Sequence, residues 1–501
     1  MRTKKAFYNT TTGIIYQLCS IVCGFIIPRL ILGYFGSEYN GMISSITQFL
    51  GWISILTAGV GGVTRAALYK PLNKNDNYKI SGIINATDNF MKKIALIFLG
   101  GLIIFAIGYP FLLKNKFEWF FVFTMVLVLG INTFAQYFFG MTYQNLLEAD
   151  QRQYIYSTVR ILTTLISTLV TVVLIIMHFD IRIVKLASSL IFAVNPIFLN
   201  IYVKKYYSID TKIAPDNSAI SQRWHAFAQE IAVMINNNTD IVVLTIFSNV
   251  LEISVYVIYN MVLSGVKQLL QTFTTGIGAA FGSMIAEGID NSSLNRKLKV
   301  FEVLVYNITT ILFSVTLVTI VPFVRVYTSN INDVNYIRPV FAIIITIAAM
   351  FNCFRIPYQT IVYAAGHFKQ TRNGSIVEVI LNLSISIILV IKIGLIGVAI
   401  GTLVGSIFRT LQYGIYLSRN IIVRSNWLFY TKIVISLLET MIIYIISSIF
   451  INISNVSYFG WISYAINIFM LSIAIVCMGS FLFYRKDTIS IIKRLIFALK
   501  R

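Results

Sequence analysis

The stretch KKIALIFLGGLIIFAIGYPFL, residues 92–112, decides the fold class. After its two lysines it holds no charged residue, and it is as long as the roughly 17–25 residues that a helix needs to cross a bilayer. Similar stretches recur along the 501-residue chain, which is 57% hydrophobic and 12% charged, with a mean hydropathy of +0.79. A soluble domain carries about a quarter charged residues. We therefore predict an all-α integral membrane protein without a soluble catalytic domain.

The apolar stretches predict about 14 transmembrane helices. The first follows a basic start, Met1–Lys5, but no small-residue cleavage site interrupts it, so we expect a retained helix rather than a signal peptide. We place the helices near 9–35, 40–68, 92–112, 117–147, 154–177, 181–204, 225–248, 252–285, 300–324, 336–365, 371–391, 394–417, 428–451 and 458–484.

The basic residues behind the formal charge of +21 are distributed unevenly between the two sides of the membrane. Of the 40 Lys and Arg residues, the inner segments of this topology hold 27 and the outer loops hold seven. This bias follows the positive-inside rule with both termini cytoplasmic. The basic charge is then expected to meet anionic headgroups of the lipid bilayer, and we expect no nucleic-acid partner.

The sequence offers no metal or redox centre. Its four cysteines lie inside predicted spans without CxxC spacing, which favours packing over disulfide or metal chemistry, and its three histidines are scattered. We find no Gly-rich phosphate loop, catalytic triad or metal-ligand cluster. We therefore expect no cofactor and no enzymatic activity.

A weak self-similarity recurs at a constant offset of 217 residues. Thr57-Ala-Gly59-Val-Gly61 aligns with Thr274-Thr-Gly276-Ile-Gly278, and Arg152-Gln153 aligns with Lys369-Gln370. Coincidence among Gly and Thr residues of membrane helices is the alternative. We favour a duplication, because several matches and the order of the helices agree at one offset.

Each half of the duplication holds six helices, so both halves have the same orientation in the membrane. Secondary transporters commonly bind substrate between such parallel repeats. We predict an N-terminal six-helix lobe over 1–205, a cytoplasmic linker over 206–222 and a C-terminal six-helix lobe over 223–420. Two additional helices and a basic cytoplasmic tail occupy 421–501.

Ionisable side chains within the predicted spans are the strongest local signal for function. Each costs about 2.5–3.5 kcal/mol in hydrocarbon, so such groups rarely persist without a partner, a cavity or water. The basic ones are Arg29, Arg65, Arg160, Lys267, Arg355 and Arg409, and the acidic ones are Glu230, Asp240, Glu378 and Glu439.

Two polar stretches are expected to face a solvated interior. Lys267 and Asp240 should lie near the midplane on neighbouring helices, and Asp240 ends the run that begins at Asn236. Arg355 lies in the stretch from Asn352 to Gln359. These cations suit the phosphate oxygens of an anionic substrate, and Asp240 could bind a coupling proton or sodium ion. The alternative for Lys267 is a buried pair with Asp240 that contacts no ligand.

The remaining charges can be explained without a ligand. Glu378 and Arg409 lie at similar depths near the cytoplasmic ends of their helices, which favours a structural ion pair. Arg65 lies close to the inner interface and could simply extend its head into water. Arg29, near the outer end of its helix, could do the same or contact the ligand.

Several short motifs, in this order and spacing, resemble the polysaccharide-transport branch of the multidrug/oligosaccharidyl-lipid/polysaccharide (MOP) exporter superfamily, which contains the O-antigen and capsular repeat-unit flippases. The motifs are Pro28-Arg-Leu-Ile-Leu-Gly33-Tyr-Phe-Gly36 with Tyr39-Asn-Gly41, Arg65-Ala-Ala-Leu-Tyr-Lys-Pro-Leu72, Glu148-Ala-Asp-Gln-Arg-Gln153, Asn238-Thr-Asp240-Ile-Val, Val255-Tyr-Val-Ile-Tyr259 and Ala365-Gly-His-Phe-Lys-Gln370.

The resemblance implies two six-helix lobes that form an inward- or outward-opening V, with two helices added. It also implies alternating access of a cationic central cavity that moves an undecaprenyl-diphosphate-linked oligosaccharide across a bacterial plasma membrane, with polysaccharide polymerase machinery as a possible partner. The substrate-binding residues carried over are Lys267, Arg355, Arg29 and Arg65, with Asn352 beside Arg355.

Two transporters of related fold are the rival functions. A drug or metabolite antiporter predicts carboxylates in the N-terminal lobe, and that lobe has none at mid-depth. A flippase for the lipid-linked cell-wall precursor is the other, and the number of helices does not separate it. An oligosaccharide polymerase would need a larger outer loop than the one from Arg325 to Tyr336.

Overall fold

The structure is a computed structural model that describes residues 2–53, 57, 60–113, 116–220, 239–274, 277–450 and 457–491. Within these ranges the regular secondary structure is helical, without a strand. Twelve of the described helices are long and apolar enough to cross a membrane. The prediction of an all-α membrane protein is confirmed.

The chain divides into two compact units, Met1–Ser254 and Val255–Arg501. The described helices of the first unit are α1 (Arg2–Phe35), α2 (Ser37–Ile53), α3 (Val60–Lys74), α4 (Asn77–Leu112), α5 (Trp119–Ala135), α6 (Met141–Ala149), α7 (Gln153–Ile176) and α8 (Ile181–Tyr206). A π-helical turn, Gln136–Gly140, joins α5 to α6. Helix α10 (Val250–Thr274) begins at the end of this unit.

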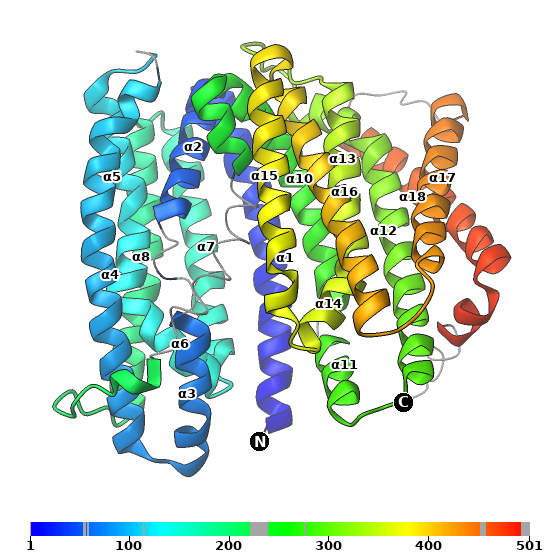
Figure 1. The fold of residues 1–501 in the computed structure, drawn as a ribbon. Coiled ribbons are helices and arrows are strands. Elements are labelled where there is room, and N and C mark those ends of the chain that lie inside the picture. The colour runs from blue at the N-terminus through cyan, green and yellow to red at the C-terminus, as the bar shows by residue number, and fades with distance from the viewer. Residues whose placement is uncertain are drawn as a thin grey trace. The chain divides into compact units, whose positions relative to one another are not determined.

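Helices of the first unit bury hydroxyl groups and expose leucine. On α7, Ser167 is buried and shares a 2.8 Å hydrogen bond with Ser188 of α8, whereas Leu162 and Leu169 are exposed. Helix α7 packs against α1 and α8, and α5 packs against α4 and α8 (Figure 1). Buried small and hydroxyl side chains let membrane helices approach and bond, because lipid already solvates the apolar ones.

In its described residues, the second unit contains the rest of α10 and eight further helices. They are α11 (Ile277–Ala286), α12 (Asn291–Tyr327), α13 (Pro339–Phe354), α14 (Ile356–Ala364), α15 (Phe368–Ile393), α16 (Leu395–Asn420), α17 (Trp427–Phe450) and α18 (Tyr458–Phe483). Helix α16 packs against both α15 and α13, and α12 packs against both α17 and α18.

A glycine seam draws α16 onto α15. A Cβ atom added to Gly401 would lie 2.7 Å from the carbonyl oxygen of Asn382 and 2.1 Å from Oγ of Ser386, which no real side chain could do. Gly397 and Gly405, one turn to either side, also face α15 closely. This small-residue spacing holds two backbones together and fixes which polar groups meet between them.

The helices of the two units follow one another at the predicted offset of 217 residues. Shifted by that amount, α2, α3, α4, the pair α5–α6, α7 and α8 match α10, α11, α12, the pair α13–α14, α15 and α16, with ends that agree within five residues. Helices α17 and α18 have no counterpart at this offset among the described helices of the first unit. The element order therefore supports an internal duplication followed by two added helices.

One predicted span is broken in the structure: the span over 336–365 breaks between α13 and α14. The span predicted over 252–285 falls on α10 and α11, and the one over 40–68 falls on α2 and α3; most of the residues that join each pair lie outside the described part. Pro357 explains the break after α13, because proline cannot donate a backbone hydrogen bond. Most of the predicted span 225–248 lies outside the described residues.

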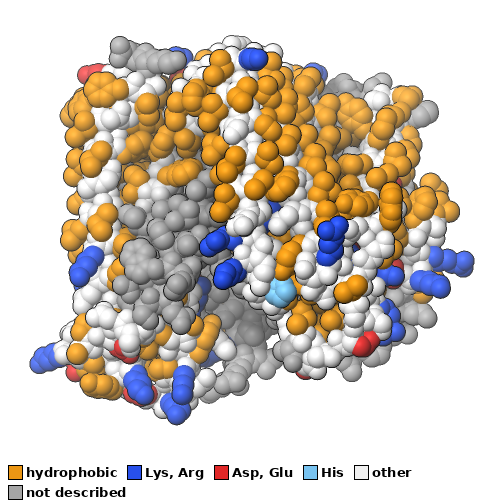
Figure 2. Space-filling view, viewed as in Figure 1, with side chains coloured by type: hydrophobic (Ala, Val, Ile, Leu, Met, Phe, Trp, Pro, Cys, Tyr) orange, Lys and Arg blue, Asp and Glu red, His pale blue; other side chains and the backbone are white. Residues whose placement is uncertain are grey.

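The surface has the pattern of a membrane protein. Figure 2 shows apolar side chains over the upper part of one face, whereas most of the Lys and Arg side chains visible there lie in its lower part. Such an uneven distribution is what charge-directed insertion produces.

Candidate functional site

The break between α13 and α14 places Arg355 at a junction of two helices. Arg355 is both the C-cap residue of α13 and the N-cap residue of α14, and Pro357 follows in the first turn of α14. Its backbone remains bonded, since its N–H donates to the carbonyl of Phe351 and its own carbonyl accepts from Gln359. The side chain therefore leaves the helix at a backbone that is interrupted but satisfied.

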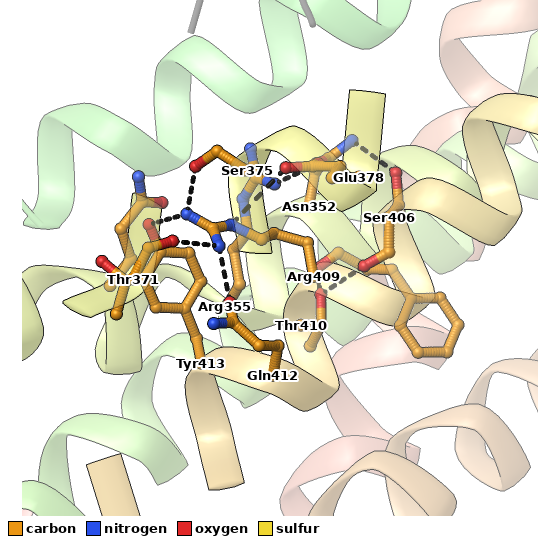
Figure 3. Close-up of polar contacts among 12 residues, drawn as sticks. Asn352, Arg355, Thr371, Ser375, Glu378, Ser406, Arg409, Thr410, Gln412 and Tyr413 are labelled. Atoms are coloured by element: carbon orange, nitrogen blue, oxygen red, sulfur yellow. Dashed lines mark hydrogen bonds and ion pairs between the residues drawn. The ribbon is translucent and has the colours of Figure 1, made fainter. Parts of the chain in front are cut away.

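Glu378 of α15 links two arginines from two other elements. Its Oε1 atom lies 2.8 Å from Nη1 of Arg355, and its Oε2 atom lies 3.5 Å from Nε of Arg409 on α16 (Figure 3). The exposed fractions of the side chains are 6% for Glu378, 3% for Arg409 and 17% for Arg355. We call these three residues the arginine–glutamate cluster.

Arg409 uses all of its donors inside the protein. Nη1 donates to the carbonyl of Thr371 at 3.0 Å and to Oε1 of Gln412 at 2.5 Å. Nη2 donates to Oγ of Ser375 at 2.5 Å and to the hydroxyl of Tyr413 at 2.7 Å, and the guanidinium lies 4.0 Å from the Tyr413 ring centroid. A guanidinium has five N–H donors, and the fifth, on Nε, faces the carboxylate. Arg409 thus holds Glu378 and has no donor left for a ligand.

Arg355 has donors to spare. In the part of the chain that the structure describes, its side chain makes one polar contact, the ion pair with Glu378. Two arginines share one carboxylate, so the arginine–glutamate cluster carries one net positive charge. That excess charge falls on Arg355, which is the more exposed of the two. Glu378 fixes the orientation of Arg355 and leaves its other N–H groups for an anion.

Lys267 adds a second cation near this cluster. It lies half-buried on α10, which packs against α13 where the rings of Tyr259 and Phe341 meet at 5.2 Å. The charges of Lys267 and Arg355 both act on the side chain of Cys353. The structure therefore brings these two predicted substrate-binding cations into one region of the second unit.

Asn352 lies beside the cluster but is engaged elsewhere. Its Nδ2 atom donates to Oγ of Ser406 on α16 at 3.0 Å (Figure 3). Thr410 of α16 donates to the carbonyl of Phe351. These two bonds fasten α13 to α16 immediately before the break, which positions Arg355.

Arg65, in the first unit, belongs to a polar network. Its Nη1 atom lies 2.7 Å from Oε2 of Glu148 and 3.1 Å from Oδ1 of Asn145, both on α6. Gln144 donates to the other carboxylate oxygen of Glu148 at 2.9 Å. Arg65 is 35% exposed, so it keeps access to solvent while its charge is matched. Arg29 is half-buried on α1.

Asp240, the predicted coupling-ion residue, is 8% exposed on the helical segment 239–247. The polar run from Asn236 to Asn238 before it lies outside the described residues. Asp240 belongs to the first unit and Lys267 to the second. Its role as an ion site stays a prediction.

Sequence reasoning missed a second buried charge cluster in the second unit. Glu302 of α12 is fully buried and pairs with Arg424, before α17, and with Lys432 of α17. The hydroxyls of Tyr306 and Tyr358 bond each other at 3.0 Å nearby. The signal was present as single charges inside the apolar sequences Phe301-Glu-Val303 and Thr431-Lys-Ile433. Their pairing could not be seen, because 130 residues separate Glu302 from Lys432.

Solved structures of transporters share this fold. The chain is similar to "Lipid II flippase MurJ, inward closed conformation", with a TM-score of 0.69, 17% identity, and 94% of this chain and 99% of that chain covered. It is also similar to the Vibrio cholerae MATE transporter VcmN in the bent form, with a TM-score of 0.56, 13% identity, and coverage of 86% and 99%.

A third similar structure is an inward-facing multidrug resistance MATE transporter of the MOP superfamily, with a TM-score of 0.54, 14% identity, and coverage of 80% and 96%. The chain has the fold of the MOP transporters. No protein-family model matches the sequence, and no curated protein matches it. The likeness shows a shared fold, and membership of the superfamily and of its polysaccharide-transport branch stays a prediction.

Proposed function

We propose that the protein is a flippase that moves a lipid-diphosphate-linked oligosaccharide, an O-antigen, capsular or similar repeat unit, from the cytoplasmic to the outer leaflet of a bacterial plasma membrane by alternating access. The observation that carries the proposal is the excess positive charge on Arg355. A guanidinium that is held by a carboxylate yet keeps open donors is suited to phosphate oxygens. Lys267 supplies a second charge for the diphosphate.

The chemistry follows from the two kinds of cation. The planar guanidinium of Arg355 offers N–H groups in a fixed fork, which suits two phosphate oxygens at once, whereas the Lys267 ammonium acts as a mobile point charge. The oligosaccharide would be recognised by shape and hydroxyl contacts. In this proposal the termini are cytoplasmic, and a polysaccharide polymerase would receive the product outside.

A flippase for the lipid-linked cell-wall precursor is the second candidate function. It is favoured by the likeness to the MurJ structure, whose printed name gives lipid II as the flipped substrate. Both candidates place a diphosphate at the same cations, and they differ in the attached glycan.

Transport in proteoliposomes tests the proposal. Fluorescent undecaprenyl-diphosphate repeat units and the cell-wall precursor are supplied separately, and movement is measured by accessibility of the label. Because a hydrogen bond to a charged group contributes about 1.5–3 kcal/mol, Arg355→Ala and Lys267→Ala should each slow flipping by about 10–100-fold. Arg160→Ala is the matched control, because it also removes an intramembrane arginine. The Arg160 guanidinium lies 4.6 Å from the centroid of the Tyr16 ring and is not part of the proposed site, so this variant should flip at the wild-type rate.

The outcomes separate the candidates. Flipping of the repeat unit but not the precursor supports the first function, and the reverse supports the second. If both variants flip as fast as the wild type, the proposed site is wrong. If the wild type moves neither lipid but exchanges soluble organic cations, the flippase proposal itself is wrong.

A further inference from the structure

A buried acidic side chain lies in the added helices, away from the arginine–glutamate cluster. Glu439 occupies the middle of α17 and is 8% exposed. It makes no hydrogen bond or ion pair with any residue that the structure describes. A charged carboxylate without a partner is costly to bury, so such a group is neutralised by a proton or by a bound cation.

The Glu439 carboxyl lies directly against the backbone of α18. A Cβ atom added to Gly479 would lie 1.9 Å from Oε1 of Glu439, so only glycine leaves room for the carboxyl at this position. The carboxyl thus lies against α18 within the added pair of helices.

Two more buried polar atoms beside Gly479 have no partner among the described residues. They are the Oγ atom of Ser480, which follows Gly479 on the buried face of α18, and the hydroxyl of Tyr484, one turn further along the chain. Tyr484 and Glu439 are close enough to interact electrostatically. Buried polar groups are normally bonded, so several unsatisfied oxygens in one place indicate a missing ligand or water.

The charged groups around Glu439 do not neutralise it. On α17, Lys432 is paired with Glu302 of α12, and its ammonium lies 5.8 Å from the centroid of the Tyr484 ring. Arg424, before α17, is paired with the same Glu302 carboxylate.

The remaining charged groups of the packed helices are not partners of Glu439 either. None of the basic residues Arg296, Lys297, Lys299 and Arg325 of α12, or Arg485 and Lys486 after α18, forms an ion pair with it. The Tyr306 hydroxyl of α12 bonds to Tyr358, Cys477 of α18 is exposed, and Tyr444 of α17 interacts with Tyr464 of α18. Among the described residues, no cation therefore pairs with the Glu439 carboxylate.

We propose that Glu439, Ser480 and Tyr484 form a monovalent-cation site between α17 and α18 that takes H⁺ or Na⁺. One carboxylate balances one positive charge, whereas a divalent ion would leave a buried excess charge. The ligands are carboxyl and hydroxyl oxygens, which suit hard cations. An occupied site lets α17 and α18 pack at Gly479 without a bare charge, and loss of the cation opposes that packing.

Labelling with the apolar reagent dicyclohexylcarbodiimide tests the site, because it modifies protonated carboxyls. The purified full-length protein is treated from about pH 6 to about pH 9, and the modified peptides are quantified by mass spectrometry. Near neutral pH, we expect labelling of Glu439 to exceed that of the exposed Glu287 by about tenfold, since burial without a partner favours the neutral acid. Glu439→Gln is the control for assignment.

The response to ions identifies the cation. Labelling is compared in about 100 mM sodium chloride and in the same concentration of choline chloride. If sodium lowers the labelling of Glu439 relative to choline, the site binds Na⁺. If only rising pH lowers the labelling, the site binds H⁺. If folded wild-type protein shows no labelling of Glu439 anywhere in this pH range, the proposal is overturned.

Removal of the hydroxyl groups tests the three-residue site. Ser480→Ala and Tyr484→Phe should each shift the pH or sodium midpoint of Glu439 labelling by about threefold or more in ion concentration, because each removes an oxygen ligand. Unchanged midpoints in both variants would show an isolated neutral carboxyl and overturn the site. These measurements need no transport, so their failure is distinct from failure of the proposed flippase function.

Discussion

The Nη1 atom of Arg355 lies 2.8 Å from Oε1 of Glu378, joining the break between α13 and α14 to the middle of α15. The same carboxylate also faces Arg409, which is saturated with contacts inside the protein. The two arginines therefore differ in their contacts although they share one partner. Arg409 is built into the helix packing, whereas Arg355 contacts only Glu378 among the described residues, and its binding of a ligand stays a prediction.

This difference predicts unequal effects of two matched substitutions. Arg409→Ala should cost about 3–5 kcal/mol of stability, because it leaves several buried polar partners of the guanidinium without a donor and leaves Glu378 with Arg355 alone. Arg355→Ala should cost less than about 2 kcal/mol, because Glu378 keeps Arg409. Thermal unfolding of the purified variants in detergent measures both. Equal losses would show that Arg355 is a structural residue and not a ligand-binding one.

Gly374 of α15 is predicted to protect the position of Arg409. A Cβ atom there would lie 2.4 Å from Nη1 of Arg409 and 2.4 Å from the side chain of Gln412. Gly374→Ala should displace the guanidinium from these bonds and destabilise the protein by about 1–3 kcal/mol. The control is Gly100→Ala on α4, where a Cβ meets nothing within 4 Å, and which should be neutral or slightly stabilising. A stable Gly374→Ala protein would show that the cluster can rearrange.

The sequence predicts the number, order and duplication of the helices because these depend on the length of apolar stretches and on charge bias. It also predicts that Glu378 and Arg409 lie at similar depths, which depends on counting residues along two helices. The contact between Arg355 and Glu378 was not predictable in this way. It depends on the rotation of each helix about its axis and on the break before Pro357, and both are set by packing between helices.

The ion pairs of Glu302 were not predictable from the sequence either. Lys432 lies near the start of the predicted span 428–451, close to the inner basic residues, yet it is buried against Glu302. Its depth alone could not distinguish an interfacial lysine from a paired one. The orientation of α12 toward α17, including the 3.1 Å bond between Ser314 and Thr440, decides the pairing.

Acid is expected to loosen the start of α12. Asp290 caps this helix by accepting from the N–H of Ser293 at 3.1 Å, and hydrogen bonds from Ser292 and Ser293 lower its pKa to about 2. A lowered folded-state pKa adds stability above the ordinary value of 3.8, and this stability is lost as pH falls through about 2.

Hydrogen exchange of the first α12 amides should accordingly rise as pH falls from about 4 to about 2, after correction for intrinsic rates. The variant Asp290→Asn should keep the cap and lose this pH dependence, because the amide oxygen still accepts a bond. Identical pH profiles for the two proteins would contradict the role of Asp290.

Glu302 should be essential to the attachment of α17, since its carboxylate neutralises both Arg424 and Lys432. Glu302→Gln leaves two buried cations unpaired and should cost about 3–5 kcal/mol of stability. Lys432→Met leaves Arg424 as a partner for Glu302 and should cost less. The two residues are in contact, so the double variant should be more stable than the sum of the single losses predicts, by about 0.5–3 kcal/mol. Chemical or thermal unfolding of the wild type, the two single variants and the double variant measures this coupling energy. Additive losses would show that the charges do not interact.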